Sequence, residues 1–517
     1  MAVATAGADY DAPVHNLTML QRALLVVVLM LSTTIYSASV LISSALLPQL
    51  QGALSATQDE VSWVMTFNIV ATAVATPAAG WLADRFGQRS TMTWCAGVFA
   101  ISTFMCGASN TLEELIFWRI VQGAAGAPLV PLGQTILLDS FPRSQHGTIL
   151  SVYGMGNMIG PSLGPMLAGQ IAESLGWRWG FWMVVPLAIA SFIGNWAVLP
   201  KDNKVQGAKL DWLGFLSLSA GIAAAQLVFS RGQRLDWFES YEIIIATLVA
   251  GLALYIFCVH SLTSERPFVR LKLLTDRNYS LGLILVMLFG MLNFATVVLL
   301  PPLLQQHAGY PDSAIGDMVG FRGIGSGIGF LLAMPMARLD PRVSLGIGAC
   351  LQAFTGLWMM GFDLNVDMQT IIISNVIQGI SIGVSWVPLT VITFWTLNPQ
   401  YRAEAMSMFH LLRNFGSSLF ISIAVVEIVR TQTVNYARMP EHITVYNRVL
   451  DLPWAMGGWT VDTAPGLAKL SNEINRQSAL IGYENAWVLY TIVALSFLPL
   501  CLLVRLPKAA TGVGAKP

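Results

Sequence analysis

Long apolar stretches separated by short polar ones recur along almost the whole chain. Most of them run for about 20 residues, which is long enough for a helix to cross the ~30 Å hydrocarbon core of a bilayer. We count about fourteen such stretches, so the pattern predicts a series of transmembrane helices. The predicted spans are 22–47, 60–81, 91–109, 112–138, 148–172, 179–199, 211–230, 241–262, 279–304, 314–337, 343–361, 369–395, 403–430 and 485–506.

The composition supports this interpretation. Of the 517 residues, 55% are hydrophobic and only 11% are charged, less than half of the ~25% usual for soluble chains. We therefore expect an all-α integral membrane protein. The net charge of zero gives no support for nucleic-acid binding. The five cysteines are scattered through apolar stretches without metal-binding spacing, so we expect no metal site and no cofactor.

The distribution of basic residues predicts the orientation in the membrane. An even number of spans puts both termini on one side, and loops rich in Lys and Arg stay in the cytoplasm. The loops on the side of the termini hold Arg85, Arg89, Arg143, Lys201, Lys204, Lys209 and Arg266, whereas the short loops on the other side hold Arg178, Arg231 and Arg234. Both termini are therefore expected in the cytoplasm. No basic cluster precedes the first span, so a cleaved signal peptide is not expected.

An internal repeat relates the two parts of the chain. The fourth span reads RIVQGAAGAPLVPL from Arg119, and the twelfth reads NVIQGISIGVSWVPL from Asn375. Further along, Asn157 matches Asn414 at nearly the same separation. Span four thus matches span twelve in sequence, eight spans later. We therefore expect two six-helix bundles with two extra central helices between them. Such parallel repeats are a transporter architecture, with the substrate path at the interface of the halves.

These boundaries divide the chain into five parts. They are an N-terminal tail 1–21, an N-terminal bundle 22–199, the two extra helices with their linkers 200–278, a C-terminal bundle 279–506 and a C-terminal tail 507–517. One outward segment, 431–484, is much longer and more polar than the other connections. We expect it to be either disordered or a small folded cap, and long loops are usually functional.

Several motifs resemble a known family. GWLADRFGQR from Gly80, RIVQG from Arg119, GNMIGPSLGPMLAG from Gly156, FRGIGSG around Arg322 and HLLRNFGSS around Arg413 occur in order. Together they resemble the major facilitator superfamily, and more narrowly its fourteen-helix drug:proton antiporter branch, the EmrB-type multidrug exporters. The resemblance covers spans one to thirteen. One position departs from the branch, since Ser39 stands where its first helix usually carries an Asp.

The resemblance implies a function and partners. It implies a transporter, not an enzyme, that exports amphipathic small molecules across the cell inner membrane by proton antiport. It also implies a periplasmic adaptor and an outer-membrane duct, with 431–484 as the docking segment. Two alternatives stay open, namely export of an endogenous anionic lipid or metabolite without proton coupling, and a membrane sensor or scaffold that transports nothing.

A turn after the second span is the first candidate site. Glycines there allow helices to approach closely, and its charges can form a network that holds the two halves in one state. The alternative is a charge cluster that only sets topology. The candidate gating residues are Gly80, Asp84, Arg85, Gly87, Arg89 and Asp139.

The fifth span carries small residues and prolines in its middle. Gly160 and Gly164 let helices touch, while Pro161 and Pro165 free backbone carbonyls and bend the helix. The helix that carries this antiporter motif could therefore rock at the interface of the halves. The alternative is that the motif serves only for tight helix packing.

Ionisable residues within spans are costly and are functional candidates by default. Three arginines lie deep in predicted spans, where they could bind anionic groups of a substrate or brace helices by bonding backbone carbonyls. No carboxylate lies near the middle of a span, so the residue that would carry the proton is not evident. The candidates for the transport path or coupling are Arg119, Gln122, Gly123, Asp317, Arg322, His410, Arg413 and Glu427.

Overall fold

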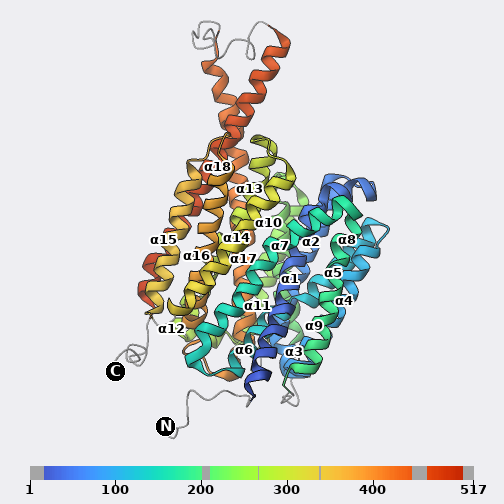
Figure 1. The fold of residues 1–517 in the computed structure, drawn as a ribbon, viewed down its shortest axis with the longest axis vertical. Helices are drawn as coiled ribbons and strands as arrows, with labels where there is room; N and C mark the ends of the chain where they lie inside the picture. Colours follow the sequence, from blue (N-terminus) through green and yellow to red (C-terminus); the bar gives the residue numbers. More distant parts are fainter. Residues whose placement is uncertain (1–16, 201–209, 266, 337–338, 445–462, 505–517) are drawn as a thin grey trace.

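The computed structural model describes residues 17–200, 210–265, 267–336, 339–444 and 463–504. These residues form helices and short connections, with no strand among them. The helices stand side by side in one bundle, and α1 begins at the same end of it at which α18 ends (Figure 1). We call this the terminal end.

Each half of the chain contributes one group of helices. The N-terminal half contains α1 (Met19–Leu54), α2 (Gln58–Ala75), α3 (Ala78–Phe86), α4 (Gln88–Ala108), α5 (Leu112–Gly126), α6 (Leu129–Ser140), α7 (His146–Leu175), α8 (Trp177–Trp182) and α9 (Val185–Val198). The C-terminal half contains α12 (Arg277–Asn293), α13 (Ala295–Pro302), α14 (Asp312–Met336), α15 (Pro341–Met360), α16 (Met368–Phe394), α17 (Arg402–Arg438) and α18 (Ala464–Leu503). The extra helices α10 (Trp212–Arg231) and α11 (Tyr241–Thr263) lie between them in sequence.

The number of spans agrees with the sequence pattern. Within the described residues, 12 helices are long and apolar enough to cross a membrane, and the pair α2–α3 makes a thirteenth. Helix α7 has 30 residues and packs along α1 and α14, so it completes the set of about fourteen. The α2–α3 pair bends by 55° next to Pro77, which has no backbone N–H to continue the helix. By contrast, α7 runs unbroken through Pro161 and Pro165.

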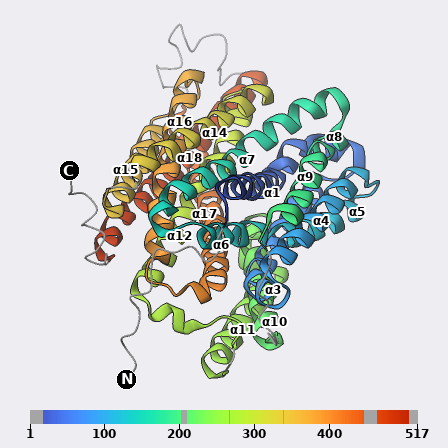
Figure 2. The ribbon, with the colours of Figure 1, turned by 60° about the horizontal axis from the view of Figure 1, so that its bottom comes forward.

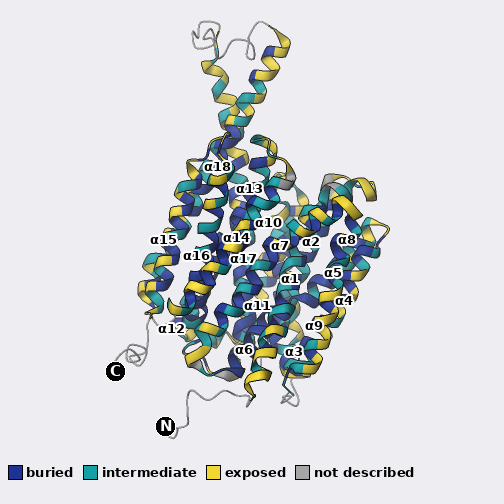
Figure 3. Cartoon of the chain, viewed as in Figure 1, coloured by how far each residue is buried: buried dark blue, intermediate teal, exposed yellow. Residues whose placement is uncertain are grey.

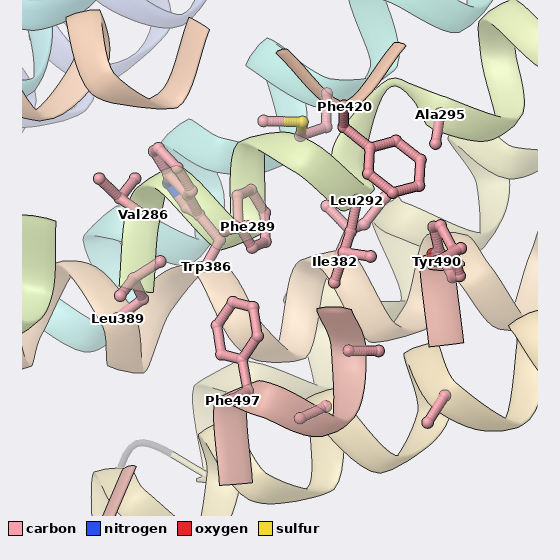
Figure 4. Packing of buried hydrophobic residues seen from close by; sticks show 14 of the residues in the cluster. Val286, Phe289, Leu292, Ala295, Ile382, Trp386, Leu389, Phe420, Tyr490 and Phe497 are labelled. Carbon is pink, nitrogen blue, oxygen red and sulfur yellow. The ribbon is translucent and has the colours of Figure 1, made fainter. Parts of the chain in front are cut away.

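Each half has its own hydrophobic core. One cluster joins side chains of the N-terminal half, among them Leu25, Phe99 and Phe181. The other joins mainly side chains of the C-terminal half, where Phe289 and Trp386 pack together and Phe420 lies near Tyr490 (Figure 4), and it extends to Leu138, Leu150 and Met158 of the N-terminal half. The chain therefore forms two six-helix bundles with two extra helices, as expected, and Figure 2 shows the bundles beside each other.

Matching glycines make matching helix contacts in the two halves. A Cβ on Gly123 of α5 would lie 2.5 Å from the backbone oxygen of Asn68 in α2. A Cβ on Gly379 of α16 would lie 2.6 Å from the backbone nitrogen of Ser326 in α14. Both glycines follow the repeated glutamine of the QG pair, so the sequence repeat reflects two equivalent backbone contacts.

Helix α10 bridges the halves on one side of the molecule. Its Gln226 side chain donates a hydrogen bond to Ser418 of α17 at 2.5 Å, and its Ser230 hydroxyl lies 3.1 Å from that of Thr66 in α2. On another side, α7 and α14 pack directly against each other. Most side chains of α11 are not buried, and this helix lies at the edge of the molecule (Figure 2).

Asp211 fixes the start of this extra pair. Its carboxylate accepts hydrogen bonds from the backbone nitrogens of Gly214 and Phe268, at 3.0 Å each, and from His260 Nε2 at 2.8 Å. Burial raises the pKa of Asp211, but these hydrogen bonds outweigh it and the net pKa lies below the usual value. The ionised carboxylate thus joins α10, the end of α11 and the linker to α12.

The outward segment 431–484 differs from the loop expected. Helix α17 continues to Arg438 and α18 already begins at Ala464, so both helices project beyond the bundle at the end opposite the terminal end (Figure 1). Polar contacts join them, including Gln432 Nε2 to Asn475 Oδ1 at 2.8 Å. The sequence pattern missed these extensions because their residues are too polar to resemble a span. Residues 445–462 lie outside the described part, so the expectation of a cap is not tested there.

The glycine contacts lead to a stability prediction. Gly379→Ala should lower the apparent Tm of the purified protein, because backbone atoms of α14 cannot move aside and overpacking costs about 1–3 kcal/mol. Gly251→Ala in α11 is the matched control, since a Cβ there meets nothing within 4 Å. Size-exclusion chromatography after heating measures the apparent Tm of each variant. An equal Tm for the two variants would contradict the prediction.

Candidate functional site: the interface between the halves

At the terminal end, α17 of the C-terminal half contacts α3 and α6 of the N-terminal half. Arg402 Nη1 donates to Asp139 Oδ1 at 2.5 Å, and both side chains are almost fully buried. A Cβ on Gly80 would lie 3.0 Å from the Cα of Glu404, so only glycine lets α3 approach this closely. We call these two contacts the terminal-end contact. It joins the halves through one buried ion pair and one backbone approach.

Asp84 lies beside this contact. The Glu404 carboxylate accepts a hydrogen bond from the backbone nitrogen of Arg270 at 2.6 Å, and the charge of Arg270 also acts on Asp84. Asp84 therefore shares a charged neighbourhood with α17 and with the linker before α12, rather than contacting Asp139.

The other expected gating residues face their own half. Arg89 donates a hydrogen bond to the backbone oxygen of Trp196, at the end of α9. Arg85 is exposed. Gly87 has a φ of +91°, a conformation that favours glycine, and it makes the turn from α3 to α4. These three residues thus shape the turn and its surface.

Arg119 is fully buried and bonded on every side. Its guanidinium donates to the backbone oxygens of Ser39 at 3.1 Å, Val40 at 3.4 Å and Val64 at 3.4 Å, and to Gln122 Oε1 at 2.5 Å. Gln122 Nε2 in turn donates to Thr103 of α4 at 2.8 Å. These are the contacts of a brace that joins α1, α2, α4 and α5. One of these acceptors belongs to Ser39, the residue that stands where the EmrB-type branch usually carries an Asp in helix one.

Arg322 makes the corresponding contacts in the C-terminal half. Its guanidinium donates to Gln378 Oε1 at 2.5 Å and to both oxygens of Asn293, the last residue of α12. Gln378 is the repeat partner of Gln122. The glutamine thus occupies the same place in both halves, while the arginine comes from α5 in one half and from α14 in the other.

Arg413 lies between the halves and has a different environment. Its side chain is 8% exposed, and its guanidinium lies 5.5 Å from the ring centre of Trp386 in α16. Its hydrogen bonds go to Asn414 Oδ1 alone, from Nε at 3.3 Å and Nη2 at 3.1 Å. One turn away, His410 Nε2 lies 2.8 Å from Gln134 Oε1 of α6. We call Arg413, His410, Trp386 and Gln134 the Arg413 cluster.

The comparisons with known proteins agree with this fold. A family model of the Major Facilitator Superfamily matches residues 28–288. The multidrug export protein EmrB of Escherichia coli is 30% identical over 503 residues, which cover 96% of this chain and 97% of that protein. The chain belongs to the major facilitator superfamily.

Further similarities come from within the superfamily. The fatty acid resistance protein FarB of Neisseria gonorrhoeae is 30% identical over 479 residues, covering 92% of this chain and 94% of that protein. The proton:xylose symporter XylE has a TM-score of 0.58 at 14% identity, covering 93% of this chain and 96% of that one. The human organic anion transporter MFSD10 has a TM-score of 0.56 at 14% identity, covering 92% and 100%. These structures share the fold, which is that of membrane transporters.

In this major facilitator chain, the remaining predicted residues lie away from the Arg413 cluster. Glu427 accepts hydrogen bonds from Thr431 at 2.9 Å and Asn485 at 3.1 Å, where α17 leaves the bundle. Asp317 lies in the second turn of α14. In α7, a Cβ on Gly160 or Gly164 would meet α1 of the same half. The face of α7 that meets α14 instead places Ser162 against Gly323.

Four residues of this interface were not predicted from the sequence. Gln134, Arg270, Arg402 and Glu404 all form contacts between elements that are distant in the chain. Arg402 and Glu404 lie near the boundary of their predicted span, where charged residues are common and therefore do not indicate a functional site. Gln134 follows the conspicuous VPL element by two residues and is a buried amide inside a span, which was the available signal.

The bracing geometry predicts how Arg119 responds to substitution. Arg119→Lys should lower both the apparent Tm and the transport rate, because one ammonium group cannot reach four acceptors spread over three helices. Arg231→Lys is the matched control. Its ion pair with Glu242 is partly exposed, and such pairs contribute little. An Arg119→Ala protein with full stability and transport would show that this residue is only tolerated.

Proposed function

We propose that this protein is a multidrug efflux transporter that exports amphipathic small molecules across the inner membrane by proton antiport, with both termini in the cytoplasm. The main support is similarity to multidrug export proteins along nearly the whole chain, at 29–30% identity for EmrB of two species. The basic loops on the side of the termini support the orientation.

The interface of the halves supports alternating access. Each half has a largely separate core and its own buried arginine brace, which favours motion of each half as a unit. The terminal-end contact closes the halves on the proposed cytoplasmic side. Breaking the Arg402–Asp139 ion pair and separating Gly80 from Glu404 would open that side, while the Arg413 cluster lies between the halves where substrate would bind.

Proton coupling is supported by the family resemblance rather than by a particular carboxylate. Among the described residues, Asp139 is the one buried carboxylate, and it is ion-paired with Arg402. His410 is buried between the halves and is the titratable group nearest to the proposed path. We therefore propose His410, a coupling candidate in the sequence, and add Asp139, which the sequence suggested only as a gating residue.

A reconstituted system tests the function and the coupling together. Proteoliposomes holding a pH-sensitive dye should show proton movement opposite to that of N-phenyl-1-naphthylamine, a neutral amphipathic dye, with a fixed stoichiometry. Asp84→Asn should abolish transport while the protein stays inserted, because it removes a charge beside the terminal-end contact. Transport of this neutral dye without a pH change would exclude proton antiport, and absence of any dye transport by the unmodified protein would exclude efflux of such compounds.

The helical extensions of α17 and α18 support a second part of the proposal, docking to a periplasmic adaptor that leads to an outer-membrane duct. They project beyond the bundle, where Val434, Tyr436 and Leu467 are each at least 40% exposed (Figure 3). Apolar and aromatic side chains beside polar ones are typical of protein interfaces. The alternative is a hairpin that only connects two spans.

We call the projecting extensions of α17 and α18 the hairpin. Truncation of this hairpin separates docking to an adaptor from a simple connection between two spans. Replacing residues 433–474 with a short Gly/Ser linker should preserve the bundle, because Gln432 and Asn475 are already hydrogen-bonded at the cut. Transport in proteoliposomes should persist, while drug resistance in cells should fall. If both persist, the hairpin is not the docking site. If transport in proteoliposomes fails, the hairpin belongs to the transport path.

A further inference from the structure

Besides Arg402 of the terminal-end contact, three arginines are buried among the described residues, and they differ in how fully their donors are satisfied. Arg119 donates to four acceptors and Arg322 to three, all from neighbouring helices or the repeated glutamine. Arg413 donates to one oxygen, on the side chain next to it in sequence. Because a buried guanidinium has five N–H groups to satisfy, Arg413 has donors left for another partner.

The neighbours of Arg413 also carry unpartnered polar atoms. Gln134 Nε2, Trp386 Nε1 and His410 Nδ1 have no hydrogen-bond partner among the residues that the structure describes, and all three side chains are at most 2% exposed. The ring centres of Trp386 and His410 lie 5.8 Å apart, and His410 contacts Gln134 through its other nitrogen. Buried donors without acceptors are rare and costly. Two such donors, Gln134 Nε2 and Trp386 Nε1, occur in this cluster, while His410 Nε2 donates to Gln134 Oε1 and leaves Nδ1 of the neutral ring as an acceptor.

The charges around the cluster leave one positive charge unbalanced. Arg413 forms no ion pair with any carboxylate of the described residues. The groups that act on it electrostatically are the phenols of Tyr36 in α1 and Tyr153 in α7. Both phenols already donate their protons, to Thr72 Oγ1 and to the backbone oxygen of Val130 respectively. Asp139, farther along α6 toward the terminal end, is paired with Arg402. The missing partner is therefore an anion.

From this arrangement we infer that the Arg413 cluster binds the anionic oxygen head group, a carboxylate or sulfonate, of an amphipathic substrate. Arg413 supplies the charge, while Gln134 Nε2 and Trp386 Nε1 supply neutral donors from α6 and α16. The head group thus bridges the N-terminal half, through Gln134, and the C-terminal half, through Arg413 and Trp386. This inference rests on the proposed export function and names the substrate class for the same interface.

A matched pair of dyes tests the head group. 1-Anilinonaphthalene-8-sulfonate carries a permanent sulfonate, and N-phenyl-1-naphthylamine has the same ring skeleton without it. In proteoliposomes containing the full chain, Arg413→Gln should raise the apparent KM for the sulfonate about tenfold or more, as expected for loss of a charge-assisted hydrogen bond. Its KM for the neutral dye should rise less, so the ratio of the sulfonate KM to the neutral-dye KM should increase. Arg413→Lys, which keeps the charge, should show a smaller increase.

A second variant tests the same site without removing the arginine. Gln134→Glu has nearly the same shape but places a carboxylate against the cluster, so it should ion-pair with Arg413 and exclude the sulfonate while transport of the neutral dye continues. This variant decides the question if Arg413→Gln does not fold. Arg231→Gln, which alters an arginine in the extra helices far from the cluster, is the control and should change neither KM.

The outcomes separate this inference from the export function. If the unmodified protein transports neither dye, the proposed export function fails. If it transports the neutral dye but not the sulfonate, export stands and the anionic head group is wrong. The inference is also overturned if folded Arg413→Gln and Gln134→Glu proteins keep the sulfonate KM of the unmodified protein. Equal impairment of both dyes would show that the cluster is structural.

Discussion

A buried guanidinium must have acceptors for its N–H groups, and this requirement organises the interior of the protein. Carrying such a charge into the membrane is expensive unless nearby oxygens satisfy it. Arg119 and Arg322 meet the requirement within their own halves, each with a glutamine from the repeated QG element and oxygens of neighbouring helices. Each half is thereby held together at its centre by polar contacts as well as by its apolar core. Arg413 does not meet the requirement from within its half, which is why the interface of the halves differs from either interior.

Close glycine packing complements these braces. In the absence of a hydrophobic driving force within lipid, helices associate through dense packing, and small residues allow it. Gly123 and Gly379 bring backbones together within the halves, whereas Gly80 does so between them. The glycine contacts within the halves form an equivalent pair, whereas between the halves the Gly80 contact lies at one end and α7 packs along α14. This asymmetry favours motion of two stiff bundles about their interface, with α10 bridging α2 and α17.

Much of the architecture follows from the sequence, but the contacts between halves do not. The spans follow from apolar length, and the two bundles follow from the repeat, whose QG glycines each pack against a helix of their own half. The sequence did not predict that Arg402 pairs with Asp139 or that Gln134 contacts His410. Nothing in a single sequence indicates that α17 packs against α6. The bend beside Pro77 was not predicted, and Pro161 and Pro165, where a bend was predicted, lie inside the continuous helix α7. Proline permits a bend, but the neighbouring helices decide whether the chain takes one.

Helix α17 connects the two features of the interface. Arg402 and Glu404 of the terminal-end contact and His410 and Arg413 of the cluster lie on this one unbroken helix, within about three turns of each other. A helix without a break moves as a rod over that length, so separation of α17 from α3 and α6 at the terminal end also shifts Arg413 relative to Gln134. A ligand that bridges Arg413 and Gln134 opposes that shift, and its dissociation allows the two side chains to move apart. Occupancy of the centre and closure of the terminal end are thus mechanically linked through a single helix, without any relay of side chains between them.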